Sequence, residues 1–282
     1  MPPIAYLNGQ FLPLEQARVS IDDRGFQFGD GVYEVVRVYR GKPFRLEDHL
    51  IRLERSAQAI SIPMTLSVGE WERVIRDGID RSQLEECKVY IQITRGVAPR
   101  EHTFPSSSIP TTVMTVRDID SIDAVLRQGG VSAITLPDQR WGRCSIKSLN
   151  LLPNLLAKQQ AKEQEAFEAI LIKEGSVTEG TSSNVMMASD DVLVTPALSD
   201  QLLAGVTRQE LLTLARHAGI QVEERVVKQD ELMEAQEVFL AGTTIEVIGV
   251  TKLDGKPIGN GHVGLMTRRL QSMLLNAVAN EC

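Results

Sequence analysis

The sequence has few cysteines, few aromatic residues and no long apolar run. Of its 282 residues only three are cysteine, and 5% are aromatic. Cys87, Cys144 and Cys282 lie far apart and offer neither a disulfide framework nor a zinc-binding spacing. We therefore expect a reducing compartment such as the cytoplasm, and no metal site. No apolar stretch reaches the roughly 20 residues of a membrane span, and residues 1–9 lack the features of a signal peptide.

An excess of positive charge is also missing. The formal net charge is -7 and the isoelectric point is about 5.3. An acidic protein is poorly suited to nucleic acid or to an anionic membrane as its main partner. The hydrophobic fraction of 43% and charged fraction of 24% are those of an ordinary globular protein. The length predicts one large domain or two modest ones.

The N-terminal part predicts a mixture of strands and helices. Residues 4–12 alternate around Asn8-Gly9, which is typical of a β-hairpin. Residues 47–60 have apolar side chains at helical spacing, and Ser67 with Glu70 forms a capping box that begins a second helix. Further strands are expected at residues 32–39, 88–94 and 111–116.

The pattern changes after residue 130. Strands are expected at residues 131–136, 169–172, 184–187, 192–194, 238–240 and 246–250. Helices are expected at residues 151–165, from a cap at Thr207 to about 217, and at 265–277. Many strands with interspersed helices, without regular alternation, predict an α+β chain in two domains. We expect an N-terminal domain at 1–119, a linker at 120–129 and a C-terminal domain carrying the lysine discussed below at 130–282.

Lys147 is the first candidate for chemistry. Most lysines are solvated surface groups. The neighbours Trp141, Ile146 and Leu149 nevertheless predict a partly buried site. Burial disfavours the ammonium form, and the free amine can then attack a carbonyl carbon.

Glu179 is the second candidate. A glutamate among Gly, Ser and Thr residues is by default a turn residue. The functional interpretation is that it accepts a hydrogen bond from a pyridine N–H and keeps that nitrogen protonated. A reactive lysine together with such a carboxylate is what a pyridoxal phosphate enzyme needs.

Three weaker features together indicate a phosphate site. Arg52 lies on the first long predicted helix. Residues 205–208 begin another helix, whose N–H groups and dipole favour an anion. Residues 242–244 supply hydroxyl groups. For Thr207 alone, a plain N-cap is the simpler interpretation.

Residues 95–110 form a long predicted loop rich in Pro, Ser and Gly, and long ordered loops are often functional. Its Arg100 and His102 could hold a carboxylate, the arginine by a bidentate fork. A solvated basic loop is an equal alternative. Tyr33 could add a phenolic donor, or it could pack half-buried with its hydroxyl satisfied.

Three sequence blocks resemble those of the fold-type IV pyridoxal phosphate enzymes, and among these they are most similar to the D-amino acid aminotransferases. The resemblance extends over nearly the whole chain. The blocks are residues 23–36 (DRGFQFGDGVYEVV), 143–152 (RCSIKSLNLL) and 177–185 (VTEGTSSNV). The loop with Arg100 and His102, together with Tyr33, resembles the part that traps the substrate carboxylate in that family.

The resemblance implies an N-terminal α/β domain and a C-terminal pseudo-barrel domain. It implies that Lys147 forms a Schiff base with pyridoxal 5'-phosphate and moves a proton, and that Glu179 partners the pyridine nitrogen. The implied phosphate ligands are Arg52, Val206, Thr207 and Thr243, and Leu203 would support the ring face. Tyr33, Arg100 and His102 would bind the substrate α-carboxylate. Gly242 departs from the family, since a serine is common there.

The implied reaction is ping-pong transfer of an amino group from a D-amino acid, such as D-alanine, to 2-oxoglutarate or pyruvate. Arg100 and His102 are implied to come from the other subunit of a homodimer. Three alternatives stay open within the same superfamily: a branched-chain L-amino acid aminotransferase, an aminodeoxychorismate lyase and an (R)-amine transaminase. An alternative from a different class is a non-catalytic carrier of the cofactor.

Overall fold

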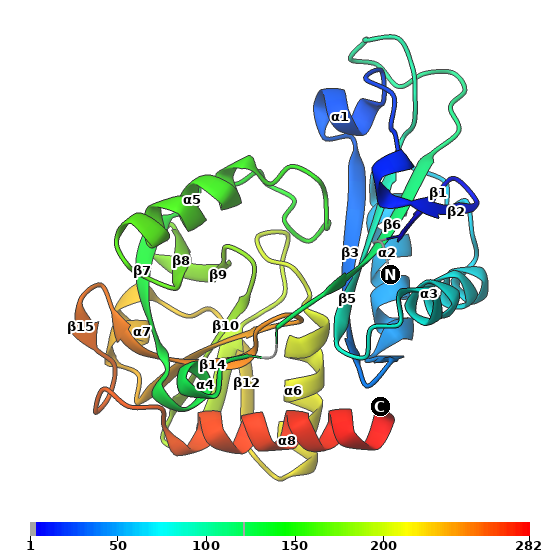
Figure 1. The fold of residues 1–282 in the computed structure, drawn as a ribbon. Coiled ribbons are helices and arrows are strands. Elements are labelled where there is room, and N and C mark those ends of the chain that lie inside the picture. Colours follow the sequence, from blue (N-terminus) through cyan, green and yellow to red (C-terminus); the bar gives the residue numbers. More distant parts are fainter. Residues whose placement is uncertain (1–3, 121) are drawn as a thin grey trace. The chain divides into compact units, whose positions relative to one another are not determined.

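The computed structural model describes residues 4–120 and 122–282, which fall into two compact units (Figure 1). Unit 1 contains residues 4–120, Ile146–Asn150 and Glu281–Cys282. Unit 2 contains Ile122–Ser145 and Leu151–Asn280. Helices and strands occur in both, which confirms the predicted α+β class.

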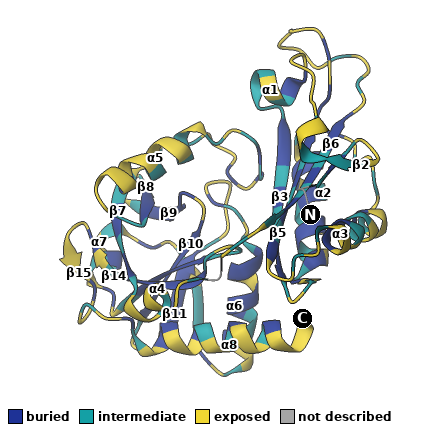
Figure 2. Cartoon of the chain, viewed as in Figure 1, coloured by how far each residue is buried: buried dark blue, intermediate teal, exposed yellow. Residues whose placement is uncertain are grey.

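Unit 1 is built on a six-stranded sheet with the order β2-β1-β6-β5-β3-β4. Its strands are β1 (Ile4–Leu7), β2 (Gln10–Pro13), β3 (Gly31–Tyr39), β4 (Lys42–Pro43), β5 (Cys87–Thr94) and β6 (Thr111–Asp118). Its helices are η1 (Leu14–Gln16), α1 (Arg24–Phe28), α2 (Leu46–Ala59) and α3 (Val68–Ser82). Helix α2 packs on β3 and α3 packs on β1 and β6, which encloses an apolar core (Figure 2).

Several local predictions for unit 1 are confirmed. β1 and β2 form the expected hairpin, and both turn residues, Asn8 and Gly9, have positive φ angles. The capping box of Ser67 and Glu70 begins α3 as expected. Helix α2 buries one face because its apolar side chains recur every three or four residues. That face includes His49 and Ser56, which the sequence did not single out.

Unit 2 is built on a larger mixed sheet with the order β12-β11-β10-β13-β14-β7-β8-β9, and β15 pairs with β14. Its strands are β7 (Val131–Pro137), β8 (Glu168–Lys173), β9 (Ser176–Gly180), β10 (Asn184–Ser189), β11 (Val192–Pro196), β12 (Val222–Arg225), β13 (Glu237–Gly242), β14 (Glu246–Leu253) and β15 (Lys256–Pro257). Its helices are α4 (Ala124–Gly129), α5 (Leu152–Glu163), α6 (Val206–His217), α7 (Gln229–Glu234) and α8 (Leu265–Glu281, of which Glu281 is counted with unit 1).

The sheet of unit 2 is curled. β9 ends the strand order, yet it contacts β10 and β11 near the other end. The turn from β9 to β10 is tight, because Gly180 N–H donates to Ser183 O at 2.7 Å. This turn brings β9 against β10. The curl agrees with the barrel-like C-terminal part that the resemblance implies.

The segment that carries Lys147 belongs to a different compact unit from the predicted domain. We expected Lys147 in the C-terminal part, whereas Ile146–Asn150 packs with unit 1. The reason is backbone pairing, since Ser148 forms a bridge with Val32 of β3. The predicted linker at 120–129 contains the short helix α4, which packs on β14 of unit 2.

Gly96 is the residue at which a side chain would be most disruptive to the 95–110 loop. Its φ is +95°, and a Cβ atom would lie 2.0 Å from the carbonyl oxygen of Ile109. We expect Gly96→Ala to lower the free energy of unfolding by at least about 1–3 kcal/mol, the cost of the backbone conformation alone. Chemical denaturation measures this. Gly41→Ala is the control, because Gly41 also has a positive φ but meets nothing within 4 Å; equal losses in both variants would show that the contact with Ile109 is unimportant.

None of the helices in the described part of the chain is long and apolar enough to cross a membrane.

Candidate functional site

Lys147 is held by its backbone on two sides within unit 1. Its carbonyl oxygen accepts a hydrogen bond from Tyr33 N–H of β3 at 3.0 Å. Its own N–H donates to Ser56 Oγ of α2 at 3.2 Å. The preceding Ile146 is buried in the core of unit 1. These contacts fix the position of the Lys147 Cα without using its side chain.

The side chain of Lys147 is half-buried and lies over an aromatic ring. Its Nζ is 4.3 Å from the centroid of the Tyr33 ring. Tyr33 stacks on Tyr90 with the ring centroids 5.8 Å apart. Burial, and then the nearby Tyr33, raise the pKa of Tyr90 to about 12, so that its hydroxyl stays neutral. The structure therefore brings together two predicted site residues, Lys147 and Tyr33.

A buried cluster of Glu34, His49 and Arg52 lies next to this pair. Glu34 faces α2 because it lies on the same buried face of β3 as Val32 and Val36. Glu34 Oε1 accepts from Arg52 Nη2 at 2.7 Å, and Oε2 accepts from Arg52 Nε at 2.9 Å. His49 Nδ1 is 3.1 Å from Glu34 Oε1. The predicted phosphate ligand Arg52 is thus held in a bidentate ion pair.

The charges of this cluster are set by its burial. Burial alone would raise the pKa of Glu34, but the charges and hydrogen bonds of Arg52 and His49 outweigh it and hold that pKa well below its usual range. Burial lowers the pKa of His49, and the positive charges of Arg52 and Lys147 lower it further, against the opposing effect of Glu34. The cluster is therefore an ionised Glu34–Arg52 pair beside a neutral imidazole. A charged residue within the β-branched run of residues 32–38 was the sequence signal for Glu34.

Arg100 and His102 lie on the surface of unit 1 and share one aromatic support. The guanidinium carbon of Arg100 is 4.6 Å from the centroid of the Phe28 ring, and the His102 ring centroid is 5.8 Å from it. Both side chains are exposed. The structure thus brings this predicted pair together at the end of α1.

Two buried arginines anchor the loop that carries this pair. Arg24 donates to the Glu101 carbonyl oxygen at 2.7 Å and to Asp30 at 2.8 Å. Arg95 also donates to Asp30 at 2.8 Å. Burial would raise the pKa of Asp30, but its hydrogen bonds and charge interactions with Arg95 and Arg24 lower it. The sequence analysis missed these anchors, since nothing local marks them.

Glu179 lies on strand β9 rather than in the turn that its neighbours suggested. β9 pairs with β8, and this pairing buries the Glu179 side chain. One carboxylate oxygen, Oε1, forms an ion pair with Arg140 Nη1. The other, Oε2, accepts from Leu203 N–H at 3.0 Å and from Asn184 Nδ2 at 3.2 Å. The predicted residues Glu179 and Leu203 are therefore in direct contact.

Arg140 is a site residue that the sequence analysis missed. It follows β7, and its side chain is only 5% exposed. On the side away from Glu179, the Asp138 carboxylate accepts hydrogen bonds from Arg140 Nε at 2.9 Å and from Arg140 Nη2 at 2.7 Å. Burial would raise the pKa of Asp138, but Arg140 and Thr178 lower it. The pKa of Arg140 is raised by both carboxylates despite its burial.

The N-terminus of α6 differs from the prediction. Thr207 was expected as the cap, but the N-cap is Gly205 and Thr207 is the second residue of the helix. A glycine is required there because a Cβ atom would lie 1.9 Å from Asn184 Oδ1. No side chain caps this helix end, so the N–H groups of its first turn face outward with the positive end of the dipole. Val206 and Thr207 thus lie where an anion is favoured.

Asn184 connects the parts of the site that unit 2 carries. Besides its bond to Glu179, its Nδ2 donates to Leu203 O at 2.9 Å. It pairs with Ala241 of β13, and β13 ends just before Thr243. Glu179, Leu203, the start of α6 and the end of β13 are therefore linked through one residue.

Each unit by itself carries groups that suit part of a pyridoxal phosphate molecule. Unit 1 offers an amine over an aromatic ring and an arginine, and unit 2 offers a buried carboxylate and a helix N-terminus without a side-chain cap. An amine matches an aldehyde, a carboxylate matches a pyridine N–H, and arginine with a helix N-terminus matches a phosphate. Within the described residues, no group of three or more His, Cys, Asp or Glu side chains could hold a metal ion.

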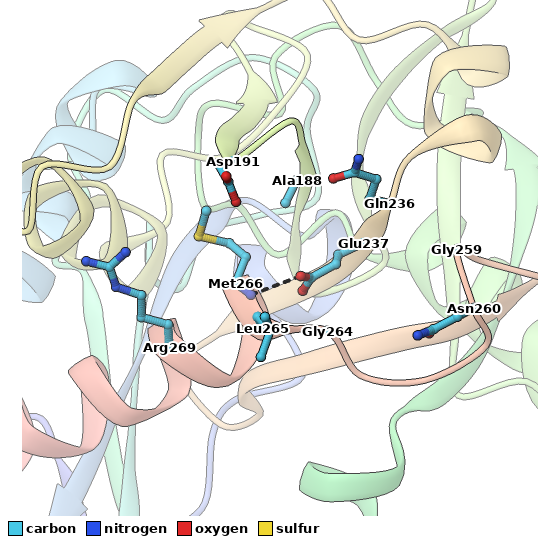
Figure 3. A pocket seen from close by; sticks show the side chains of 10 residues that line it. All are labelled: Ala188, Asp191, Gln236, Glu237, Gly259, Asn260, Gly264, Leu265, Met266 and Arg269. Atoms are coloured by element: carbon cyan, nitrogen blue, oxygen red, sulfur yellow. Dashed lines mark hydrogen bonds between the residues drawn. The ribbon is translucent and has the colours of Figure 1, made fainter.

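A cavity of about 570 Å³ in unit 2 has a different lining (Figure 3). It lies beside the start of α8, and its lining includes Asp191, Glu237 and Arg269 but none of the predicted site residues. Glu237 accepts from Met266 N–H and Thr267 N–H, both at 2.9 Å. This carboxylate caps the first turn of α8, which gives Glu237 a structural role.

Comparisons with known proteins give consistent results. The family model described as amino-transferase class IV matches residues 31–253. A protein of Bacillus licheniformis named D-alanine aminotransferase is 44% identical over 274 residues, which are 97% of this chain and 96% of that protein.

Two solved structures share the fold. The branched-chain amino acid aminotransferase of Escherichia coli superposes with a TM-score of 0.93 at 26% identity, covering 100% of this chain and 96% of that one. A branched-chain amino acid aminotransferase from a second organism, abbreviated T.th., was solved with pyridoxamine 5'-phosphate and gives a TM-score of 0.92 at 26% identity with the same coverage.

Proposed function

Because the chain belongs to the class IV aminotransferases, a family that uses pyridoxal 5'-phosphate, we propose that it transfers the amino group of a D-amino acid to a 2-oxo acid. D-Alanine is the proposed donor, and 2-oxoglutarate or pyruvate is the proposed acceptor. The observation that carries the choice of donor is the 44% identity, over nearly the whole chain, to a protein named D-alanine aminotransferase. The branched-chain relatives with the same fold are only 26% identical.

When bound, pyridoxal phosphate supplies the carbonyl that takes up the amino group and the ring that withdraws electrons from the substrate Cα. Lys147 supplies the amine that holds the cofactor and takes the proton from the substrate Cα. Glu179 is the proposed acceptor for the pyridine N–H. Arg52, Val206, Thr207 and Thr243 are the proposed phosphate ligands, and Leu203 is proposed to lie against the ring face.

Tyr33, Arg100 and His102 are proposed to bind the substrate carboxylate. A planar guanidinium suits a carboxylate because it donates two parallel hydrogen bonds. With the carboxylate held there, the hydrogen on the substrate Cα must face Lys147, which selects one enantiomer. The D enantiomer is the one that satisfies both requirements in this proposal.

Arg100 and His102 are further proposed to act in the second subunit of a homodimer. Their exposure on unit 1 supports this, because both side chains are available to another molecule. Helix α5 also exposes a row of leucines: Leu152, Leu155 and Leu156 are 66%, 62% and 61% exposed. The three free cysteines suit the reducing cytoplasm, which is the proposed compartment.

A donor screen tests the proposed function. The purified protein, loaded with pyridoxal phosphate, is given D-alanine, L-leucine or an (R)-amine, each with 2-oxoglutarate and with pyruvate. Turnover of D-alanine well above that of L-leucine is expected. A preference for L-leucine, or for the amine, would overturn the assignment. Pyruvate release from aminodeoxychorismate without an acceptor would indicate a lyase, and bound cofactor without any turnover would indicate a carrier.

Arg100→Ala is expected to raise KM for D-alanine by roughly 10- to 100-fold, the value of a lost charge-assisted hydrogen bond, with a smaller change in kcat. Initial rates over a range of D-alanine concentrations measure this. Arg76→Ala is the matched control, because Arg76 is an exposed arginine paired with Glu72 on α3. An unchanged KM in the Arg100 variant would mean that the carboxylate binds elsewhere.

A further inference from the structure

Arg140 stands between two carboxylates in unit 2. Asp138 accepts hydrogen bonds from Arg140 Nε and Nη2. The other terminal nitrogen of Arg140, Nη1, donates to Glu179 Oε1. Two more acceptors fix the plane of the guanidinium. Nη2 donates to Gln201 O at 2.9 Å and lies 3.3 Å from Thr178 Oγ1. A guanidinium bound at so many points has little freedom to turn.

The side chains of the cluster are buried. The side chains of Asp138, Arg140 and Glu179 are 3%, 5% and 8% exposed. Asp138 and Glu179 thus bring two carboxylates to one guanidinium. Cys144 lies within electrostatic reach of all three side chains and of Lys173. Burial and the two carboxylates raise the pKa of the Cys144 thiol to about 11, despite the opposing effect of the two cations, so Cys144 adds no charge.

Glu179 belongs to this cluster, and its proposed ligand is a protonated pyridine nitrogen, which carries one positive charge. An ionised Glu179 carboxylate complements that charge, whereas a protonated carboxyl group would not. Asp138 occupies Nε and Nη2 of the guanidinium, so Arg140 meets Glu179 through Nη1.

We propose that Arg140, clamped by Asp138, is a positioning residue that fixes the direction of the Glu179 carboxylate and keeps it ionised for the pyridine N–H of the cofactor. The inference rests on the proposed function, because Glu179 has a ring nitrogen to bind only if the cofactor is pyridoxal phosphate. Arg140 itself is not expected to touch the substrate.

The test uses variants that separate this role from simple support of the fold. Arg140→Met alone leaves Asp138 as a buried charge without its guanidinium, which destabilises the protein for an unrelated reason. The double variant Asp138→Asn with Arg140→Met removes both partners, a change that is much better tolerated. Arg140→Lys keeps the positive charge but loses the fork. Arg225→Met is the matched control, because Arg225 pairs with two carboxylates of the same unit at the surface.

Two measurements are made on each variant. The dissociation constant of pyridoxal phosphate is determined on the apoenzyme across the pH range, and the absorbance of the bound cofactor is titrated with acid. The double variant is expected to bind pyridoxal phosphate on the order of 10- to 100-fold more weakly. The acidic limb of its binding curve should move to higher pH by about one unit, because the loss of Arg140, which contacts Glu179 directly, outweighs the loss of the Asp138 charge and favours the protonated carboxyl. Arg140→Lys should restore part of the affinity and the original limb.

The outcomes distinguish the role of Arg140 from the proposed function. A double variant with wild-type affinity and an unmoved acidic limb would overturn the role of Arg140. A loss of thermal stability without a change in the limb would reduce Arg140 to structural support and would also overturn it. Failure of the wild-type protein to bind pyridoxal phosphate, or wild-type affinity in Glu179→Gln, would instead overturn the proposed function.

Discussion

The Lys147→Ala variant is expected to lose D-alanine transamination by at least about 10⁴-fold, because one amine is asked to serve both as the cofactor-binding nucleophile and as the base for the substrate Cα proton. The fold should survive this change. The backbone bonds of residue 147 to Tyr33 and Ser56 do not involve its side chain, so alanine keeps them. Steady-state and single-turnover rates with D-alanine and pyruvate measure the effect.

The control for this experiment is Lys252→Ala, an exposed lysine on β14, for which we expect wild-type rates. Circular dichroism checks that both variants are folded. Adding a small primary amine to the Lys147 variant provides a second readout, because a base supplied from solution should recover part of the lost rate. Appreciable turnover by Lys147→Ala without added amine would remove Lys147 from the mechanism.

Glu34→Gln should cause the largest loss of stability. Glu34 is fully buried and forms two hydrogen bonds to Arg52. Removing one partner of a buried ion pair leaves the other charge uncompensated, which costs about 3–5 kcal/mol. Denaturation of the apoenzyme at neutral pH measures this. The variant Glu72→Gln, which breaks the exposed pair with Arg76, should change the free energy of unfolding by less than about 1 kcal/mol.

The pH dependence of this loss has a definite sign. The pKa of Glu34 in the folded protein lies below its unfolded value, so the stability it contributes is present above the unfolded pKa of about 4.3 and is lost as pH falls through the folded pKa. The difference between wild type and Glu34→Gln should therefore shrink in acid. A difference that stays constant down to pH 2 would show that the charge of Glu34 is not what stabilises the fold.

His49 adds a second acid-sensitive contribution in the wild type. Its pKa is lowered in the folded state, so the unfolded chain binds more protons below its own pKa of about 6.5. Stability should begin to fall as pH drops below about 6.5. His49→Gln should remove this part of the pH dependence, while the part due to Glu34 remains.

Local signals predicted much of the fold. The Asn8-Gly9 turn and the Ser67–Glu70 capping box each depend on neighbours within a few residues, and both were confirmed. Helix α1 was missed because its five residues are too few to show an apolar period. Its boundaries come instead from Asp23, whose side chain accepts from Gly25 N–H, and from Gly29 in the left-handed conformation.

The limits of local reasoning are clearest at the site. Lys147 and Glu179 were identified from their sequence blocks, and their chemistry was inferred from residue type. Their immediate partners were not, because contact partners are set by strand pairing and not by spacing. Arg140 is 39 positions from Glu179, and Ser56 is 91 positions from Lys147. β9 was mistaken for a turn because Thr178-Glu179-Gly180 is polar, although its backbone completes a buried sheet.

The pairing of residues 146–150 with β3 has a consequence for how the protein is made. The 24 residues Ile122–Ser145 of unit 2 are synthesised before Ile146–Asn150. Unit 1 therefore still lacks this segment when its N-terminal stretch has left the ribosome. Contacts of such long sequence separation form slowly. A fragment that stops near residue 120 would lack both the lysine and the bridge between Ser148 and Val32. The two units therefore cannot be produced as separate pieces by a single cut.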